Sequence, residues 1–134
     1  MIFHAERPIY MQLMDEIKRQ IAAGRLAPGA KIDSIRELAA FYAVNPNTVQ
    51  RALSELERNG LLSTKRASGK MVTEDTQMIE ELRSNLASER IAALLSAMES
   101  LGFSAGEIRE LFDQAQKARS CQMDEPGRTQ GGGL

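Results

Sequence analysis

The spacing of apolar residues along the chain predicts a mainly α fold with a small β-hairpin. A first helix is expected from Pro8 to about Ala23, where an isoleucine or leucine recurs every four residues and Gly24 can end the helix. A short second helix should begin at Ser34–Glu37, because this sequence is a capping box in which each side chain bonds the other residue's backbone amide. Two longer apolar stripes predict a helix over about 78–101 and another that begins at a second capping box, Ser104–Glu107.

The stretch 45–60 predicts a third helix with two different faces. Asn45 can cap it, Pro46 suits the first helical position, and Gly60 can end it. One interpretation of this helix is that it reads DNA, because amides and an arginine near a helix N-terminus suit base edges in the major groove. The other interpretation is an ordinary amphipathic helix with a solvated polar face. The apolar face carries Val49, Ala52, Leu53 and Leu56, and the polar face carries Asn47, Gln50, Arg51, Ser54 and Arg58.

The segments on either side of this helix favour the DNA-reading interpretation. Only Ala43 and Val44 separate it from the short second helix, which is the spacing of a helix-turn-helix. After it, residues 61–66 and 70–73 predict two short strands, joined by a turn in which Gly69 can adopt a positive φ. We therefore expect a winged helix-turn-helix, with phosphate or minor-groove contacts from Lys65, Arg66 and Lys70.

Charge is distributed unevenly between the two halves of the chain. The net charge is −1, which argues against a strongly basic, nonspecific nucleic-acid binder. Residues 1–73 nevertheless hold 11 Lys and Arg against 7 Asp and Glu, whereas residues 74–134 hold 6 against 11. This asymmetry predicts phosphate contact by the first half and protein contact by the second.

The residue inventory argues against an enzyme. With one histidine and one cysteine, the chain has few groups for nucleophilic catalysis or a closed metal site, so no cofactor or metal is expected. Apolar runs are too short for a membrane span, and no signal pattern opens the sequence, which together predict a cytoplasmic protein without a membrane partner.

Three parts are expected along the chain: a DNA-binding domain over 1–73, a two-helix dimerisation domain over 74–119, and a flexible tail over 120–134. Two amphipathic helices of this size cannot bury their apolar stripes alone, so they must pack on the first domain or on a second chain. The residues that we expect in a dimer interface are Ile79, Leu82, Leu86, Ile91, Leu94, Leu95, Met98, Leu101, Ile108, Leu111 and Phe112.

Several of these motifs, taken in order, resemble the GntR family of bacterial transcription regulators. The resemblance to the family covers about residues 8–73. Segments 45–49 and 101–104 are similar to the YtrA subfamily, and with them the resemblance extends to about residue 118. The motifs are Pro8-Ile9-Tyr10, Ile21-Ala22-Ala23-Gly24-Arg25-Leu26-Ala27-Pro28-Gly29, Ser34-Ile35-Arg36-Glu37-Leu38-Ala39, Thr48-Val49-Gln50-Arg51-Ala52-Leu53 and Leu56-Glu57-Arg58-Asn59-Gly60-Leu61-Leu62.

The resemblance implies a homodimeric regulator of transcription that controls transporter operons. We expect it to be a repressor that binds a palindromic operator in double-stranded DNA. Pro46 stands where many relatives have a DNA-contacting arginine, and the hairpin lacks one glycine and one basic residue of the family pattern. No effector can be named; if a small molecule binds, the dimer interface is the expected place. The residues expected at the DNA are Ser34, Arg36, Asn45, Asn47, Thr48, Gln50, Arg51, Lys65, Arg66, Gly69 and Lys70.

A second interpretation remains open from the sequence alone. The acidic second half and the net charge of −1 are compatible with a winged-helix adaptor that binds protein and no DNA. The polar and basic face of the third helix and the basic hairpin favour the DNA-binding regulator instead.

Overall fold

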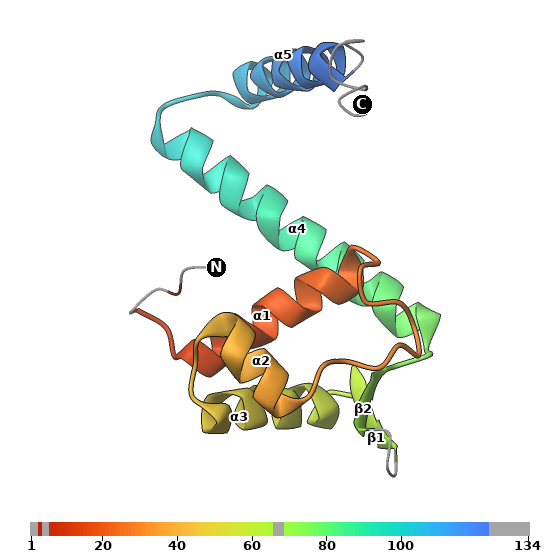
Figure 1. The fold of residues 1–134 in the computed structure, drawn as a ribbon. Helices are drawn as coiled ribbons and strands as arrows, with labels where there is room; N and C mark the ends of the chain where they lie inside the picture. The colour runs from red at the N-terminus through yellow and green to blue at the C-terminus, as the bar shows by residue number, and fades with distance from the viewer. Residues whose placement is uncertain (1–2, 4–5, 66–68, 124–134) are drawn as a thin grey trace. The chain divides into compact units, whose positions relative to one another are not determined.

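The computed structural model describes residue 3 and residues 6–65 and 69–123. The chain divides into two compact units, Met1–Ser88 and Glu89–Leu134. Within the described residues, five helices and a two-stranded antiparallel hairpin confirm the predicted fold class (Figure 1).

The first unit begins with three helices, α1 (Ile9–Ala22), α2 (Ile35–Tyr42) and α3 (Pro46–Arg58). The capping box at α2 is confirmed, because the Glu37 N–H donates to Ser34 Oγ and the Ser34 N–H donates to Glu37 Oε1. At α3, Asn45 Oδ1 accepts a hydrogen bond of 2.7 Å from the Asn47 N–H, so the predicted cap is also confirmed. Local sequence signals therefore set where both helices begin.

A left-handed residue makes the turn between α2 and α3. Ala43 has φ 56° and ψ 48°, and its N–H donates to the carbonyl of Ala39. This conformation is uncommon for a residue with a side chain, and here it reverses the chain within two residues. The tight connection places α3 directly after α2, as the helix-turn-helix interpretation requires.

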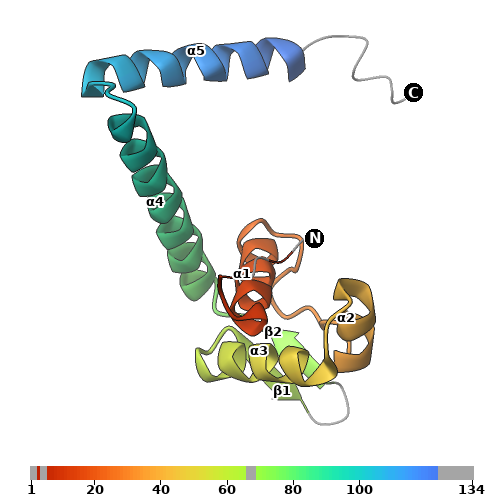
Figure 2. The same ribbon diagram turned by 90° about the vertical axis from the view of Figure 1, so that its left-hand side faces the viewer.

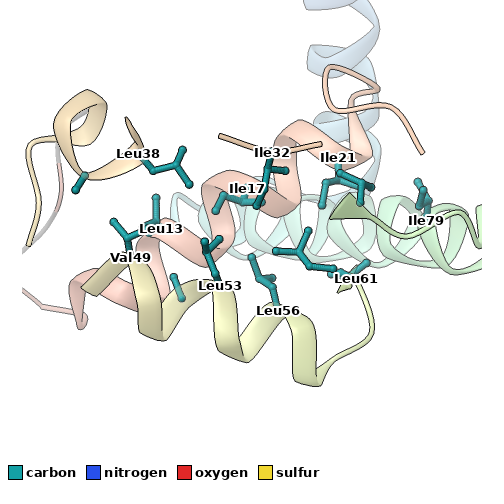
Figure 3. Packing of buried hydrophobic residues seen from close by; sticks show 14 residues of the cluster. Leu13, Ile17, Ile21, Ile32, Leu38, Val49, Leu53, Leu56, Leu61 and Ile79 are labelled. Carbon is teal, nitrogen blue, oxygen red and sulfur yellow. The ribbon is translucent and has the colours of Figure 1, made fainter. Parts of the chain in front are cut away.

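The three helices share one apolar core (Figure 3). Leu13 of α1 and Val49 and Leu56 of α3 are completely buried, so α1 packs along the apolar face of α3. Leu61 and Val72 close the core from the hairpin side. The polar face of α3 is consequently turned away from the core, and its position is fixed by this packing.

The hairpin consists of β1 (Leu62–Lys65) and β2 (Gly69–Val72), which pair in antiparallel register from Leu62 opposite Val72 to Lys65 opposite Gly69. Gly69 has a φ of 82°, as the predicted turn needs, but Arg66 and the predicted turn residues 67 and 68 lie outside the described residues. The segment 29–32 runs along β2, with hydrogen bonds from the Ile32 N–H to Lys70 O and from the Val72 N–H to Ala30 O. Backbone hydrogen bonds therefore tie the hairpin to the segment that leads into α2.

Helix α4 (Thr76–Ser100) begins in the first unit. Asp75 accepts a hydrogen bond from the Met78 N–H, and Ile79 lies in the apolar core with Leu82 packed against it. The structure therefore places these two residues in the first unit, and Leu86 as well, although the sequence predicted all three for the dimer interface. Periodicity identifies an apolar stripe, but it does not identify what the stripe packs against.

The second unit contains the rest of α4 and α5 (Ala105–Met123). The predicted capping box at Ser104 is present, with bonds of 2.8 and 3.2 Å between this residue and Glu107. Helix α5 continues beyond Arg119, where the sequence predicted its end, and residues 124–134 lie outside the described part. Among the described helices, none is by itself long and apolar enough to span a membrane, although α4 and α5 taken together as a bent pair meet the length and composition test.

Candidate nucleic-acid interface

A groove of about 590 Å³ lies in the first unit, bordered by the N-terminus of α2, one edge of α3 and the hairpin. Figure 2 shows these three elements next to one another. Five of the residues predicted at DNA line this groove: Ser34, Arg36, Gln50, Gly69 and Lys70. Residues far apart in the sequence are thus brought to one surface, which mixes cations, amide groups and a helix N-terminus.

The face of α3 that is turned away from the core carries exposed polar side chains. Asn47, Gln50 and Arg51 are exposed, and Thr48 is half-buried. Gln50 Nε2 donates a hydrogen bond of 3.3 Å to Ser54 Oγ, and both side chains are exposed. A base edge could replace Ser54 as the partner of Gln50, because the exchange would leave no buried polar group unpaired. Asn45 is different, because its side-chain oxygen already accepts the capping hydrogen bond. Its direct role is therefore to begin the helix.

Arg36 stands exposed in the first turn of α2, next to the capping box. The neighbouring Glu37 accepts the Ser34 N–H, and this hydrogen bond keeps the pKa of the Glu37 carboxyl below its ordinary value. The carboxylate thus stays tied to the cap, while Arg36 lines the groove. A cation beside free N–H groups at a helix start suits a phosphate oxygen.

The hairpin cations differ from one another. Lys70 Nζ lies 2.7 Å from Glu57 Oε1 of α3 and 3.0 Å from Thr64 Oγ1, and its side chain is only 18% exposed. The hydrogen bond from Lys70 lowers the pKa of Glu57. Lys70 therefore links the hairpin to α3, an arrangement that the sequence analysis missed. Lys65 is exposed at the end of β1, and Arg66 lies outside the described residues.

A second contact that the sequence did not predict joins α3 to α1. The guanidinium carbon of Arg51 lies 3.9 Å from the centroid of the Tyr10 ring, and Arg51 Nη2 donates to Tyr10 Oη over 3.3 Å. The two residues are 41 positions apart in sequence, so no local pattern signals the contact. Arg51 and Gln50, although neighbours, lie on different edges of α3.

The described residues contain no cluster of three or more histidine, cysteine or acidic side chains that could hold a metal ion. The surface they do form has the chemistry of nucleic-acid contact: amides on a helix, cations at its borders, and a hairpin beside it.

Comparison with known proteins places these features in a family. The sequence profile of the gntR family of bacterial regulatory proteins matches residues 9–72. The uncharacterised HTH-type transcriptional regulator YhcF of Bacillus subtilis is 37% identical over 108 residues, covering 81% of this chain and 89% of that protein. The HTH-type transcriptional repressor YtrA of the same organism is 41% identical over 70 residues, covering 52% of this chain and 54% of that protein.

Solved structures agree with the sequence matches. A GntR family transcriptional regulator from Listeria monocytogenes has a TM-score of 0.77 and 37% identity, covering 84% of this chain and 98% of that one. The DNA-binding domain of AraR in complex with operator ORX1 has a TM-score of 0.51 and 28% identity, covering 54% of this chain and 93% of that one. With its winged helix-turn-helix and an exposed polar face on α3, the chain belongs to the gntR family of bacterial regulatory proteins and is a DNA-binding transcriptional regulator of that type.

Proposed function

We propose that the protein is a homodimeric repressor that binds a palindromic operator, within the YtrA subfamily and in the cytoplasm. The observation that carries the DNA-binding part is the groove between α2, α3 and the hairpin, because it gathers Arg36, Gln50 and Lys70 from three separate elements. The relative YtrA, itself a repressor by name, supports the subfamily and the direction of the effect. Control of a transporter operon is the corresponding biological role.

In this proposal, the side chains on α3 have different tasks from those around it. Asn47 and Gln50 contact base edges in the major groove, since both are exposed amides in the first turns of the helix. Arg36 and Lys65 bind backbone phosphates and set the orientation of the domain on the duplex. Sequence preference should therefore depend on the amides, and overall affinity on the cations.

The dimer is supported by the second unit, where apolar side chains gather and remain exposed among the residues that the structure describes. Ile91, Leu94, Leu95 and Phe112 line a groove of about 420 Å³, and each of them is exposed in a single chain. Exposed apolar side chains that gather in a groove can form a docking surface for a partner. A second copy is the proposed occupant, because a two-fold dimer presents the same apolar groove from both chains.

A dimer of this kind determines the form of the binding site. Two copies of α3 would contact two half-sites related by a two-fold axis, with centres about 34 Å apart or a multiple of it. The half-sites should then be inverted copies of one short sequence. A single half-site should bind much more weakly, because the second contact becomes intramolecular only in a dimer.

The test is selection of the purified protein against random duplex DNA at near-physiological salt, followed by sequencing of the bound fraction. Enrichment of an inverted repeat is the expected result. Enrichment of a single, unrepeated half-site would contradict the dimeric mode, and the absence of any enriched sequence would contradict sequence-specific binding. Repression itself is tested by placing the recovered site in a reporter promoter, where expression should fall when the protein is present.

The division of tasks is tested with two variants and a control. Gln50→Ala should change which bases are enriched at one position of each half-site, with a loss of about 1–3 kcal/mol on the original operator. Lys65→Ala should weaken all duplexes by a similar factor and reduce the salt dependence. Ser63→Ala, an exposed position on the same strand as Lys65, should do neither. Equal effects of Gln50→Ala on operator and random DNA would contradict its assignment to bases.

A further inference from the structure

The contact between Tyr10 and Arg51 is absent from every role assigned above, and it lies at the edge of the DNA-facing surface. The guanidinium of Arg51 sits over the Tyr10 ring at 3.9 Å, and one of its N–H groups bonds the phenol oxygen over 3.3 Å. Stacking of a guanidinium on an aromatic face is attractive because the ring carries negative charge density on its face. The arginine therefore has a defined position before any ligand arrives.

The ring that holds Arg51 is itself fixed. Tyr10 lies in the first turn of α1, is half-buried, and packs against the apolar core that joins α1 to α3. Figure 3 shows this core between the two helices, with Leu13 of α1 facing Val49 and Leu53 of α3. The ring cannot follow a moving arginine without disturbing the packing. The contact consequently restrains the arginine rather than the tyrosine.

The position of Arg51 differs from that of its neighbour in a way that separates their tasks. Gln50 lines the groove between α2 and the hairpin, whereas Arg51 turns toward α1. An arginine that reads a base must extend outward from the helix into the major groove. Arg51 is instead drawn back against the neighbouring helix, at the border of the reading face, where the sugar-phosphate backbone runs beside a bound recognition helix.

The remaining chemistry of the guanidinium suits a phosphate. It carries five N–H donors in a planar fork, and the bond to Tyr10 occupies one of them. The side chain is exposed, so its outer edge is open to a ligand. A phosphate can accept two parallel hydrogen bonds from such an edge. Because the stacked ring already restricts the rotamers of Arg51, the arginine loses less conformational entropy when it binds.

We propose that Tyr10 is a positioning residue for DNA binding: it holds Arg51 at the α1 edge of the reading helix, where Arg51 binds a backbone phosphate and no base. This inference rests on the proposed operator binding, and it gives Arg51 a different role from the base contact that the sequence suggested. It also makes the first turn of α1 part of the DNA-binding apparatus, although Tyr10 itself touches no DNA.

The experiment is a double-mutant cycle on the full-length protein with the duplex recovered by selection, and affinities are measured at several salt concentrations. Arg51→Ala should weaken binding by about tenfold on all sequences and reduce the salt slope by about one. Tyr10→Leu should weaken binding by about two- to fivefold, the range expected from loss of a cation–π contact at an exposed site. The double variant should bind no more weakly than Arg51→Ala alone, because Tyr10 acts only through Arg51.

Two further variants separate positioning from simple structural support. Tyr10→Phe retains the ring and should remain within about twofold of the native affinity, since the cation–π contact is kept. The chain has two tyrosines, and Tyr42, which is half-buried against the same core but bonds to Gln20, provides the matched control. Tyr42→Leu should lower thermal stability without changing the affinity or the salt slope.

NMR spectroscopy can detect the contact between Tyr10 and Arg51 directly, in the absence of DNA. The ring current of Tyr10 should shift the NMR signals of the Arg51 side chain in the native protein and in Tyr10→Phe, and this shift should vanish in Tyr10→Leu.

Independent, multiplicative losses in the double variant would overturn the positioning role, and a changed base preference in Arg51→Ala would overturn the phosphate role. If the native protein selects no duplex at all, the proposed operator binding fails and this inference fails with it.

Discussion

Helices of both units carry apolar side chains, but these side chains are buried to very different degrees. In the first unit, Leu13, Val49 and Leu56 are completely buried. In the second, Ile91 is 56% exposed and Phe112 is 47% exposed, although both stand on well-formed helices. The comparison shows that apolar residues on a helix do not reveal whether they are covered within the chain, because their burial depends on how many elements surround them.

The number of elements explains this difference. Three helices, the hairpin and the start of α4 surround the core of the first unit, so each apolar face meets another. Up to residue 123, where the described part of the chain ends, the second unit contains the rest of α4 and α5, and two helical segments can cover only one side of each other. The described residues of the first unit thus enclose a core, while those of the second leave large apolar side chains exposed.

The largest expected effect is on the core of the first unit. Leu56→Ala should lower the free energy of unfolding by about 2–5 kcal/mol, because it removes buried methyl groups and leaves a cavity that the neighbours cannot fill completely. Chemical denaturation followed by circular dichroism measures this loss. Ser54→Ala, at an exposed position on the same helix, should change the stability by no more than about 0.5 kcal/mol. Similar effects of both variants would contradict a core closed within the first unit.

The second-largest expected effect is on the dissociation constant of the proposed dimer. Leu94→Glu should weaken dimerisation at least about hundredfold, because the proposed interface would bury a carboxylate among apolar side chains without a partner. Sedimentation equilibrium over a range of concentrations measures the dissociation constant. Ser96→Glu adds the same charge on the same helix outside the apolar groove and should leave the dimer intact. Dissociation by both variants would indicate a general effect of charge and not a specific interface.

The smallest effect concerns the link between the hairpin and α3. Glu57→Gln should destabilise the first unit at pH 7 by no more than about 1 kcal/mol, because the Glu57 side chain is 37% exposed and solvent screens the pair. Its pKa is lowered in the folded chain by the hydrogen bond from Lys70, so this contribution is present above the unfolded value of about 4.3 and disappears as the pH falls through the folded pKa. The difference between the native protein and the variant in urea denaturation should therefore shrink progressively at acidic pH, below about 4.3. A difference that does not shrink there would exclude the ion pair as its source.

Much of the first unit could be predicted because its signals are local. The capping box at Ser34, the cap at Asn45 and the positive φ of Gly69 each depend on residues a few positions apart, and the same holds for the capping box at Ser104 in the second unit. The helix-turn-helix and hairpin follow from the order of these elements. The continuation of α5 past Arg119 was not predicted, since the apolar pattern ends before the helix does.

Contacts between distant residues could not be predicted in the same way. The pairing of Lys70 with Glu57 joins the hairpin to α3, and the stacking of Arg51 on Tyr10 joins α3 to α1. Both involve residues that a sequence pattern places on a solvated or DNA-facing surface. Ile79 illustrates the same limit for apolar residues: its helical position was predicted, whereas its burial in the first unit depends on packing that only the folded chain provides.

The left-handed backbone of Ala43 has a consequence for the reading helix. A residue with a side chain favours the right-handed region by roughly 1–2 kcal/mol, so the turn between α2 and α3 is held in place by the packing around it and not by its own preference. A synthetic peptide that contained only these two helices would relax at this residue and present α3 at another angle. The angle at which the protein offers its recognition helix is thus a property of the whole folded unit, and it cannot be transplanted with the motif alone.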